Sequence, residues 1–145
     1  RIPFEMVTVE YRRGVFLPEA GLWLDPRDAA AFAFVSHAHS DHTGRHARTV
    51  ATPATLKIME RRMGALGGAL VPLDFHERRD FGSFAMTLIP AGHVLGSAQA
   101  LVETAGGSLL YTGDFKIRAG ASAEPAGCVG AETRVMETTY GLPRF

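Results

Sequence analysis

The 145-residue sequence predicts a mixed α/β domain that is rich in strands and has one well-marked helix. Most of the chain consists of short segments in which apolar residues alternate with polar ones or run together, as in half-buried and fully buried strands. Only one segment has the apolar stripe of an amphipathic helix. Residues of the kinds that favour turns separate the segments. The length suits a single domain with a substantial core.

The first part of the chain predicts strands at residues 7–12, 15–17, 21–25 and 31–35. Gly14 marks a hairpin between the first two, and Pro26 ends the third. Residues 31–35 are all apolar, which favours a strand that is buried on both faces.

The predicted helix follows a brief strand at residues 50–51. Thr52 is expected to cap it, Pro53 to take its first position, and residues 54–63 to continue it. Further strands are expected at 71–73, 84–90, 97–103, 108–112 and 133–137. Residues 118–130, rich in alanine and glycine, predict a loop.

The charges and the cysteine content limit the function classes. Lys and Arg total 15, Asp and Glu also total 15, and the net charge is zero. A nucleic-acid-binding protein of this charge would need a local basic patch, a metal site or another domain. No apolar run reaches the roughly 20 residues of a membrane span, so no membrane partner is expected. The single cysteine, Cys128, excludes a disulfide within the chain, and a reducing cytoplasm is the expected compartment.

A run of potential metal ligands, HAHSDH at residues 37–42, directly follows the buried strand at 31–35. In an extended backbone, residues two apart point to the same side, so His37 and His39 should aim at one point. Asp41 and His42 follow at the turn and can surround a second point. Imidazole and carboxylate groups are ligands of zinc and similar divalent ions. Because a solvated loop needs no such density of ligands, the run predicts a metal site.

Two further potential ligands each follow a predicted strand. His93 comes just past the end of the strand at 84–90, and Asp114 just past the strand at 108–112. Alone, the histidine would be a core or surface residue and the aspartate a turn residue. Beside the histidine-rich run, both are expected to complete a set of metal ligands.

The HAHSDH run, His93 and Asp114 resemble the metal-binding motifs of the metallo-β-lactamase superfamily. The segments PAGHVLGSA at 90–98 and TGDF at 112–115 resemble those of the β-CASP nucleases. The segment ETTYG at 137–141 is similar to the one that opens their cap domain. Residues 36–44 look most similar to the bacterial DNA-ligase-associated exonucleases. The superfamily resemblance extends over nearly the whole chain.

This resemblance implies an αββα sandwich, with two sheets face to face, helices outside and two divalent metal ions at one edge. It implies a metal-dependent phosphodiesterase, specifically a DNA exonuclease in repair, that uses a hydroxide held by zinc or manganese ions. One ion would be held by His37, His39 and His93, the other by Asp41 and His42, with Asp114 bridging. Asp41 and Asp114 would be the catalytic carboxylates.

The sequence departs from the family in one respect, because no histidine follows His93. The family supplies a further metal ligand near its carboxyl end and further histidines from its cap domain. Residues 1–145 are therefore expected to be the amino-terminal part of a metallo-β-lactamase domain, without the cap domain and the carboxyl-terminal part. The expected partners are that missing part, a nucleic acid substrate (DNA rather than RNA) and a DNA ligase.

Three other residues are weaker candidates. Lys116 and Arg118 occupy alternate positions beyond Asp114 and would face one phosphate if this segment were a strand, the alternative being a surface role. Glu137 is expected to hold a metal-ligating histidine in place through a hydrogen bond.

Two other functions fit the same ligand pattern. One is a small-molecule metallo-hydrolase of the thioesterase or lactamase type, which the β-CASP-like segments argue against. The other is a metal-binding fragment without catalytic activity of its own, because one ligand of the second ion is missing.

Overall fold

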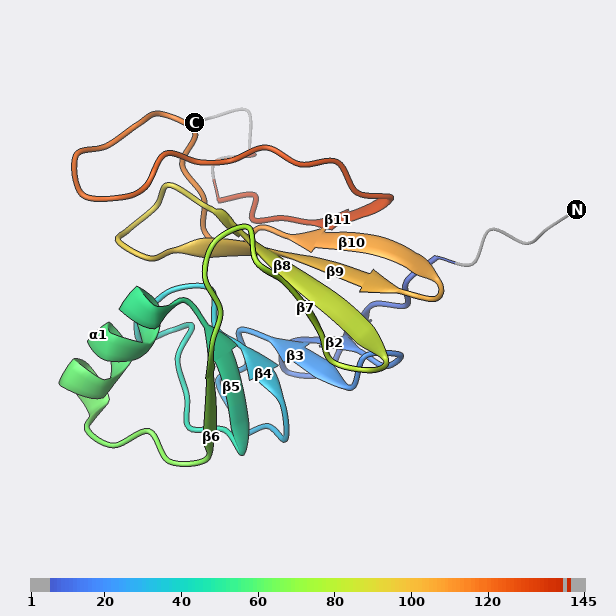
Figure 1. Cartoon of the computed structure of the whole chain (residues 1–145), viewed down its shortest axis with the longest axis horizontal. Helices are drawn as coiled ribbons and strands as arrows, with labels where there is room; N and C mark the ends of the chain where they lie inside the picture. Colours follow the sequence, from blue (N-terminus) through green and yellow to red (C-terminus); the bar gives the residue numbers. More distant parts are fainter. Residues whose placement is uncertain (1–5, 140, 142–145) are drawn as a thin grey trace, which may run out of the picture.

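The computed structural model describes residues 6–139 and 141, which form two β-sheets and one α-helix, α1 (Pro53–Met63). Figure 1 shows the sheets as a lower and an upper layer, with α1 beside the lower one. The lower sheet has the order β1 (Glu10–Tyr11), β2 (Val15–Leu17), β3 (Leu22–Leu24), β4 (Ala33–Phe34), β5 (Arg48–Ala51), β6 (Ala69–Pro72). The upper sheet has the order β11 (Thr133–Val135), β10 (Gly107–Tyr111), β9 (Ala98–Thr104), β8 (Phe84–Pro90), β7 (Arg78–Asp80). The predicted mixed α/β class is confirmed.

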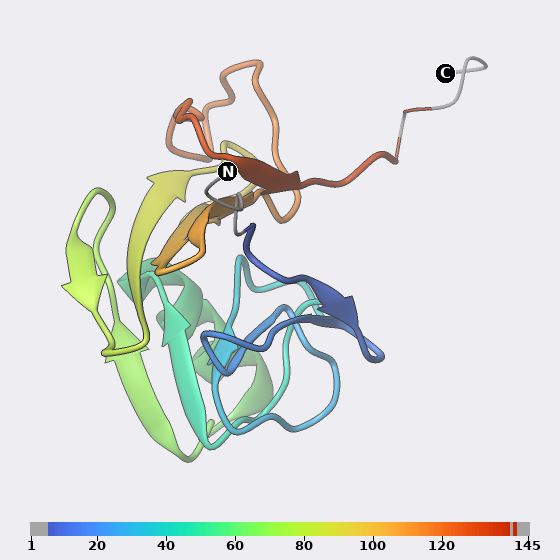
Figure 2. The ribbon, with the colours of Figure 1, turned by 90° about the vertical axis from the view of Figure 1, so that its right-hand side faces the viewer.

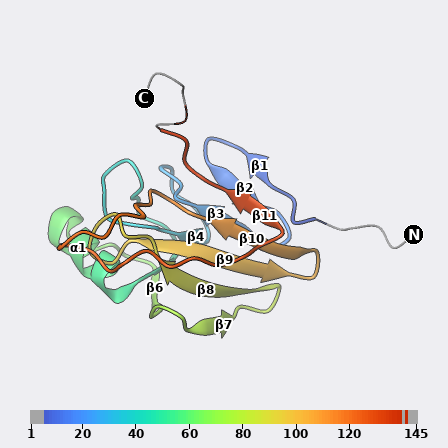
Figure 3. The ribbon, with the colours of Figure 1, turned by 90° about the horizontal axis from the view of Figure 1, so that it is seen from above.

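The two sheets differ in strand direction. In the first sheet β1, β2 and β3 pair antiparallel, and β3 to β6 pair parallel. In the second sheet every pair is antiparallel except β10 with β11. Seen from above, the second sheet runs in order from β11 to β7 (Figure 3).

The main core lies between the sheets. Leu22, Leu24 and Phe34 from the first sheet pack in one cluster with Met86 and Val102 from the second. Alternate residues of β8 and β9 supply this cluster, as expected of strands with one face turned to a core. This burial holds the two sheets face to face and fixes their edges relative to each other.

A second cluster joins α1 to the first sheet, because Leu56 and Met59 pack with Val35 and Ala51. The Thr52 side chain accepts a hydrogen bond from the Thr55 amide at 3.2 Å, as an N-cap should. The predicted helix and its capping residue are therefore confirmed.

One strand was not predicted, and some were predicted too long. The edge strand β7 consists of two arginines and an aspartate, so it has no apolar alternation that could identify it. Its Arg78 pairs with Glu103 of β9 at 2.9 Å. The strand predicted at 7–12 is limited to Glu10–Tyr11, and the strand at 31–35 to Ala33–Phe34.

The predicted loop at 118–130 is confirmed, since the segment between β10 and β11 contains no helix or strand. Figures 1 and 2 show it on the side of the second sheet that faces away from the first. Among the described residues no helix is both long and apolar enough to cross a membrane.

Candidate metal centre

The topology brings four strand ends to one edge of the molecule. β3 and β4 are parallel neighbours, so Asp25 and the histidine-rich run leave the first sheet at the same edge. β8 and β10 both pair antiparallel with β9, so they point the same way and deliver His93 and Asp114 to one edge of the second sheet. The Ala98 amide donates to the Ser36 carbonyl at 2.9 Å and ties the two edges together.

The first group of potential ligands consists of three histidines and an aspartate. Ligand atoms of His37, His39, His93 and Asp114 all lie within 4.8 Å of one another. The Nδ1 atom of His39 is 3.0 Å from Nε2 of His37 and 3.3 Å from Nε2 of His93. Oδ2 of Asp114 is 3.7 Å from Nε2 of both His37 and His93.

These separations fit a small divalent cation. A tetrahedral zinc ion with bonds of about 2.0–2.1 Å to nitrogen sets its ligand atoms about 3.4 Å apart. The ring planes of His37, His39 and His93 lie at 82–86° to one another, so the rings do not stack and their nitrogens converge. The donor set and these four separations are therefore compatible with a small divalent cation.

The second group is built around His42. Its Nε2 atom lies 3.5 Å from Oδ2 of Asp41 and 3.6 Å from Oδ1 of Asp114. The two carboxylate oxygens of Asp114 thus face different groups, Oδ2 the three histidines and Oδ1 His42.

Asp25 is a part of the site that the sequence reasoning missed. Its carboxylate accepts hydrogen bonds from the Ser36 amide at 2.7 Å, the Ser36 hydroxyl at 2.6 Å and the Tyr111 hydroxyl at 2.9 Å. It also lies 2.9 Å from Nδ1 of His42, and its side chain is only 4% exposed. The available signal was its position, directly after an apolar strand that pairs with the strand preceding the histidine-rich run.

The proton positions around Asp25 follow from these bonds. Since the Ser36 hydroxyl donates to Asp25, its oxygen is left to accept from Nδ1–H of His37 at 2.9 Å. Nδ1–H of His42 donates directly to Asp25. In their neutral forms both histidines therefore present the Nε2 lone pair to the centre, the arrangement that a metal ligand requires.

The electrostatics also suit a cation. Burial lowers the pKa of His37 to about 4, helped by the charge of His42, so His37 is neutral near pH 7. Burial alone would lower the pKa of His42, but the hydrogen bond to Asp25 and the nearby carboxylates outweigh it and raise the pKa. The pKa of Asp41 is lowered, because its backbone hydrogen bond and the neighbouring histidines outweigh its desolvation. A neutral His37 and an ionised Asp41 have the protonation that metal binding needs, whereas the charged form of His42 has to release a proton when a metal binds.

Several known proteins are similar to this chain in sequence. A protein named "Probable DNA ligase" from Opitutus terrae is 45% identical over 139 residues, which covers 94% of this chain and 14% of that protein. A protein named "5' exonuclease Apollo" from Gallus gallus is 34% identical over 103 residues, 67% of this chain and 22% of that protein. The chain belongs to the β-CASP nuclease branch of the metallo-β-lactamase superfamily.

A further β-CASP relative, "Cleavage and polyadenylation specificity factor 73" from Drosophila melanogaster, is 31% identical over 119 residues, 61% of this chain and 17% of that protein. No family model matches the chain. The chain spans between 14% and 22% of the length of these three relatives, so it corresponds to a limited part of each.

Three residues predicted for this β-CASP site lie outside the cluster. Lys116 and Arg118 are exposed, and the strand expected to align them is absent, because β10 ends at Tyr111 and the chain turns away at the sheet edge. Glu137 accepts hydrogen bonds from the Phe115 amide at 3.0 Å and the Thr139 hydroxyl at 2.7 Å. It therefore holds the residue next to Asp114, rather than a histidine, among the residues described.

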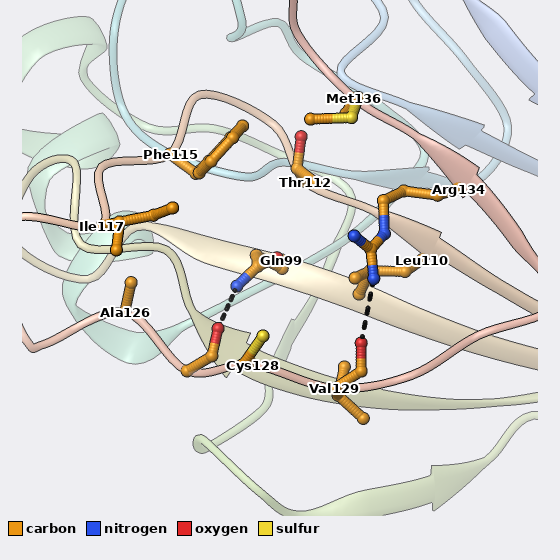
Figure 4. Close-up of a pocket in the computed structure, with 11 residues that line it drawn as sticks. Gln99, Leu110, Thr112, Phe115, Ile117, Ala126, Cys128, Val129, Arg134 and Met136 are labelled. Carbon is orange, nitrogen blue, oxygen red and sulfur yellow. Dashed lines mark hydrogen bonds between the residues drawn. The ribbon is translucent and has the colours of Figure 1, made fainter.

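Two hollows lie near this edge of the β-CASP chain. One, of about 550 Å³, is lined by Asp25, Asp41 and His42 together with the β1–β2 hairpin. The other, of about 190 Å³, lies under the segment 126–129, and its lining contains no histidine or aspartate (Figure 4). In it, the Gln99 side chain donates to the Gly127 carbonyl at 2.9 Å and Arg134 to the Val129 carbonyl at 3.4 Å. Only the first hollow adjoins groups that can act in hydrolysis.

Proposed function

We propose that this chain forms the amino-terminal part of a binuclear, metal-dependent phosphodiesterase that cleaves nucleic acid, DNA in preference to RNA. The observation that carries the proposal is the position of Asp114, with one carboxylate oxygen toward three histidines and the other toward His42. A relative named a 5' exonuclease and another named a probable DNA ligase support DNA and a role in repair. Residues 1–145 would be the first part of an αββα sandwich, completed by a cap domain and a carboxyl-terminal part.

In this proposal each ligand group holds one divalent ion. His37, His39 and His93 would hold the first ion, Asp41 and His42 would hold the second, and Asp114 would serve as a ligand of both. The ligand separations suit zinc, and manganese is the alternative for a phosphodiesterase. When bound, such ions lower the pKa of water to about 7 and stabilise charge on a phosphate under attack.

Other residues of the chain fix the orientation of the potential ligands. Asp25 fixes His42 directly and His37 through the Ser36 hydroxyl, so one buried carboxylate sets a histidine in each group. Tyr111 donates to the same carboxylate, and burial together with the charge of Asp25 raises its pKa, so it stays protonated as a donor. In this proposal Asp41, whose side chain is 57% exposed, would orient an attacking water.

The test is cleavage of end-labelled single-stranded DNA by the full-length protein that contains this chain. Cleavage should stop after exhaustive chelation, return with zinc or manganese, and be abolished by Asp41→Ala. Asp28→Ala is the control, because Asp28 is exposed and lies outside both ligand groups. Cleavage that survives chelation or Asp41→Ala would contradict the proposal, and turnover of a thioester or β-lactam without cleavage of nucleic acid would favour a small-molecule hydrolase.

A further inference from the structure

We propose that the hollow of about 550 Å³ beside His42 binds a single nucleic acid strand next to the reacting phosphate. Arg13 and Arg27 would contact backbone phosphates, and a base would stack on Tyr11. This inference rests on the proposed function and names three residues that hold the substrate without taking part in the chemistry. The hollow is called the strand-binding hollow below.

The wall of the strand-binding hollow is a row of side chains on one face of the first sheet. Tyr11 pairs with Val15, and Val15 pairs with Leu24, so the three side chains share a face. Leu24 is buried in the core, Val15 is half-buried, and Tyr11 is 83% exposed. Seen from above, β1 lies beyond β11 at the margin of the second sheet (Figure 3). The row thus ends in an exposed aromatic ring.

Two arginines add positive charge to this wall. Arg13 has no ion pair or hydrogen bond within residues 6–139 and 141 and lines the hollow. Arg27 donates from Nε to the Asp41 carbonyl at 3.1 Å, which leaves its terminal amino groups without a partner in the same residues. This bond places the Arg27 guanidinium next to the second ligand group.

The acids in the hollow form no ion pair with these arginines among the described residues. Asp25 is buried and already accepts three hydrogen bonds besides its contact with His42. Asp41 belongs to the ligand group: its main-chain carbonyl accepts the hydrogen bond from Arg27, and the Arg27 charge helps to lower the pKa of its carboxyl without an ion pair between the two in the described part of the chain. The side-chain charge of both arginines is therefore available to a phosphate.

The adjacent residue Arg12 differs from Arg13, because its charge already has a partner. Its Nε atom is 2.5 Å from a carboxylate oxygen of Glu10, and its guanidinium lies 5.3 Å from the centre of the Phe16 ring. Arg12 and Arg13 belong to the same turn, yet only Arg13 lines the hollow. Arg12 is thus a matched control for Arg13.

This combination fits a single strand better than a duplex. Proteins that bind single strands without sequence preference combine a positive groove with aromatic rings on which bases stack. A duplex keeps all base faces except those of its terminal pairs stacked inside, so a base within it cannot stack on Tyr11. Since the net charge of the chain is zero, any electrostatic attraction for phosphates has to be local, as it is here. The hollow therefore predicts binding of single strands or frayed ends, with little sequence preference.

The stacking contact is tested by fluorescence anisotropy with a labelled oligothymidylate and an abasic oligomer of equal length, in the full-length protein with chelator present to prevent cleavage. Tyr11→Leu should weaken binding of oligothymidylate about tenfold, the effect of losing one stacked base, and leave the abasic oligomer unaffected. Tyr11→Phe should retain the wild-type affinity because it keeps the ring. Equal loss for both oligomers, or tighter binding of a blunt duplex, would overturn the stacking role.

The phosphate contact is tested by the salt dependence of the same binding. Arg13→Asn should weaken both oligomers severalfold and reduce the slope of log affinity against log salt by about 0.7, the value for one phosphate of a single strand. Asn tolerates the left-handed backbone at this position, where φ is 57°. Arg13→Lys should restore most of the affinity, and Arg12→Asn should change neither affinity nor slope.

Each result separates this inference from the proposed function. Equal effects of Arg12→Asn and Arg13→Asn, or no binding of single strands by the wild type, would overturn the strand-binding hollow. Metal-dependent cleavage could still stand in either case. Cleavage that survives chelation would instead remove the proposed function.

Discussion

The two halves of the ligand cluster are built differently. In the half that contains His39 and His93, potential ligands converge from both sheets, and their polar atoms lie 3.0–3.7 Å apart. In the other half a single histidine, His42, is held by the buried carboxylate of Asp25 and faces Asp41 and Asp114 at 3.5–3.6 Å. The first half therefore contains several potential ligands, whereas the second contains one histidine whose orientation is fixed by a buried carboxylate.

This difference predicts unequal affinity for two metal ions. A site with three imidazoles and a carboxylate has a full tetrahedral set, whereas His42, Asp41 and Asp114 supply three ligands. The first ion should therefore bind more tightly than the second. His37 belongs to the first group, and the Ser36 hydroxyl links it to Asp25, which holds His42 of the second group.

Removing His37 should have the largest effect, because it affects both halves. His37→Ala removes a fully buried imidazole and should lower the affinity for the first ion by more than about 100-fold, beyond the loss caused by removing a supporting partner. Metal content after gel filtration, measured by mass spectrometry, checks this. The control is His76→Asn, at an exposed position with a left-handed backbone that Asn tolerates. Wild-type metal content in His37→Ala would show that His37 is not a ligand.

A methyl group at Gly113 should disturb the place where the two halves of the ligand cluster meet, at Ser36 and Asp114. Gly113 has φ of 53°, and an added Cβ would lie 2.6 Å from Cβ and Oγ of Ser36, which bonds to Asp25. Gly113→Ala should cost about 2–4 kcal/mol in the free energy of unfolding, from backbone strain of about 1 kcal/mol plus overpacking. Affinity for both ions should fall as well, because Ser36 and Asp114 move.

Gly21→Ala is the control that measures the cost of backbone strain alone in the free energy of unfolding. Gly21 has φ of 60° but nothing within 4 Å of an added Cβ, so it should cost only about 1 kcal/mol. Urea denaturation of both variants gives the difference. If the two losses are equal, Ser36 can yield to the added methyl and the junction is not tightly packed.

Much of the fold and most of the cluster could be predicted from local signals. Thr52 and Pro53 marked the start of α1, and apolar alternation marked β8 and β9. The strand β7 could not be predicted in this way, because an edge strand of charged residues is stabilised by pairing with β8 and by salt bridges. These partners lie elsewhere in the sequence.

Asp25 could not be assigned for a similar reason. An aspartate before a proline has the local pattern of a turn, and its four contacts come from Ser36, His42 and Tyr111, which lie 11 to 86 residues away. The prediction of a strand at Lys116 and Arg118 was wrong for the opposite reason. Its alternating pattern is real, but the chain leaves the sheet after Tyr111.

Asp25→Asn should separate the two halves. The substitution keeps the size of the side chain but removes the charge that fixes His42, so affinity for the second ion should fall about 10–100-fold. The first ion should be affected less, because its contact with Asp25 runs only through Ser36 and His37. Isothermal titration with zinc resolves the two steps, and Asp28→Asn is the control. Equal weakening of both steps would mean that Asp25 supports the whole edge rather than one half.

In the metal-free chain, the pH at which His37 and His42 titrate should differ between the two halves of the ligand cluster. NMR of the imidazole protons should show His37 titrating near pH 4, because it is buried, and His42 above its ordinary value of 6.5, because Asp25 holds its charged form. The stability that His37 contributes is present above about pH 6.5 and is lost as the pH falls toward 4, since the unfolded chain takes up the proton first. The contribution of His42 has the opposite sign: it is present below pH 6.5 and is lost as the pH rises through its raised pKa. If the His37 and His42 rings titrate at the same pH, Asp25 acts on both equally, and the two halves do not differ in their electrostatics.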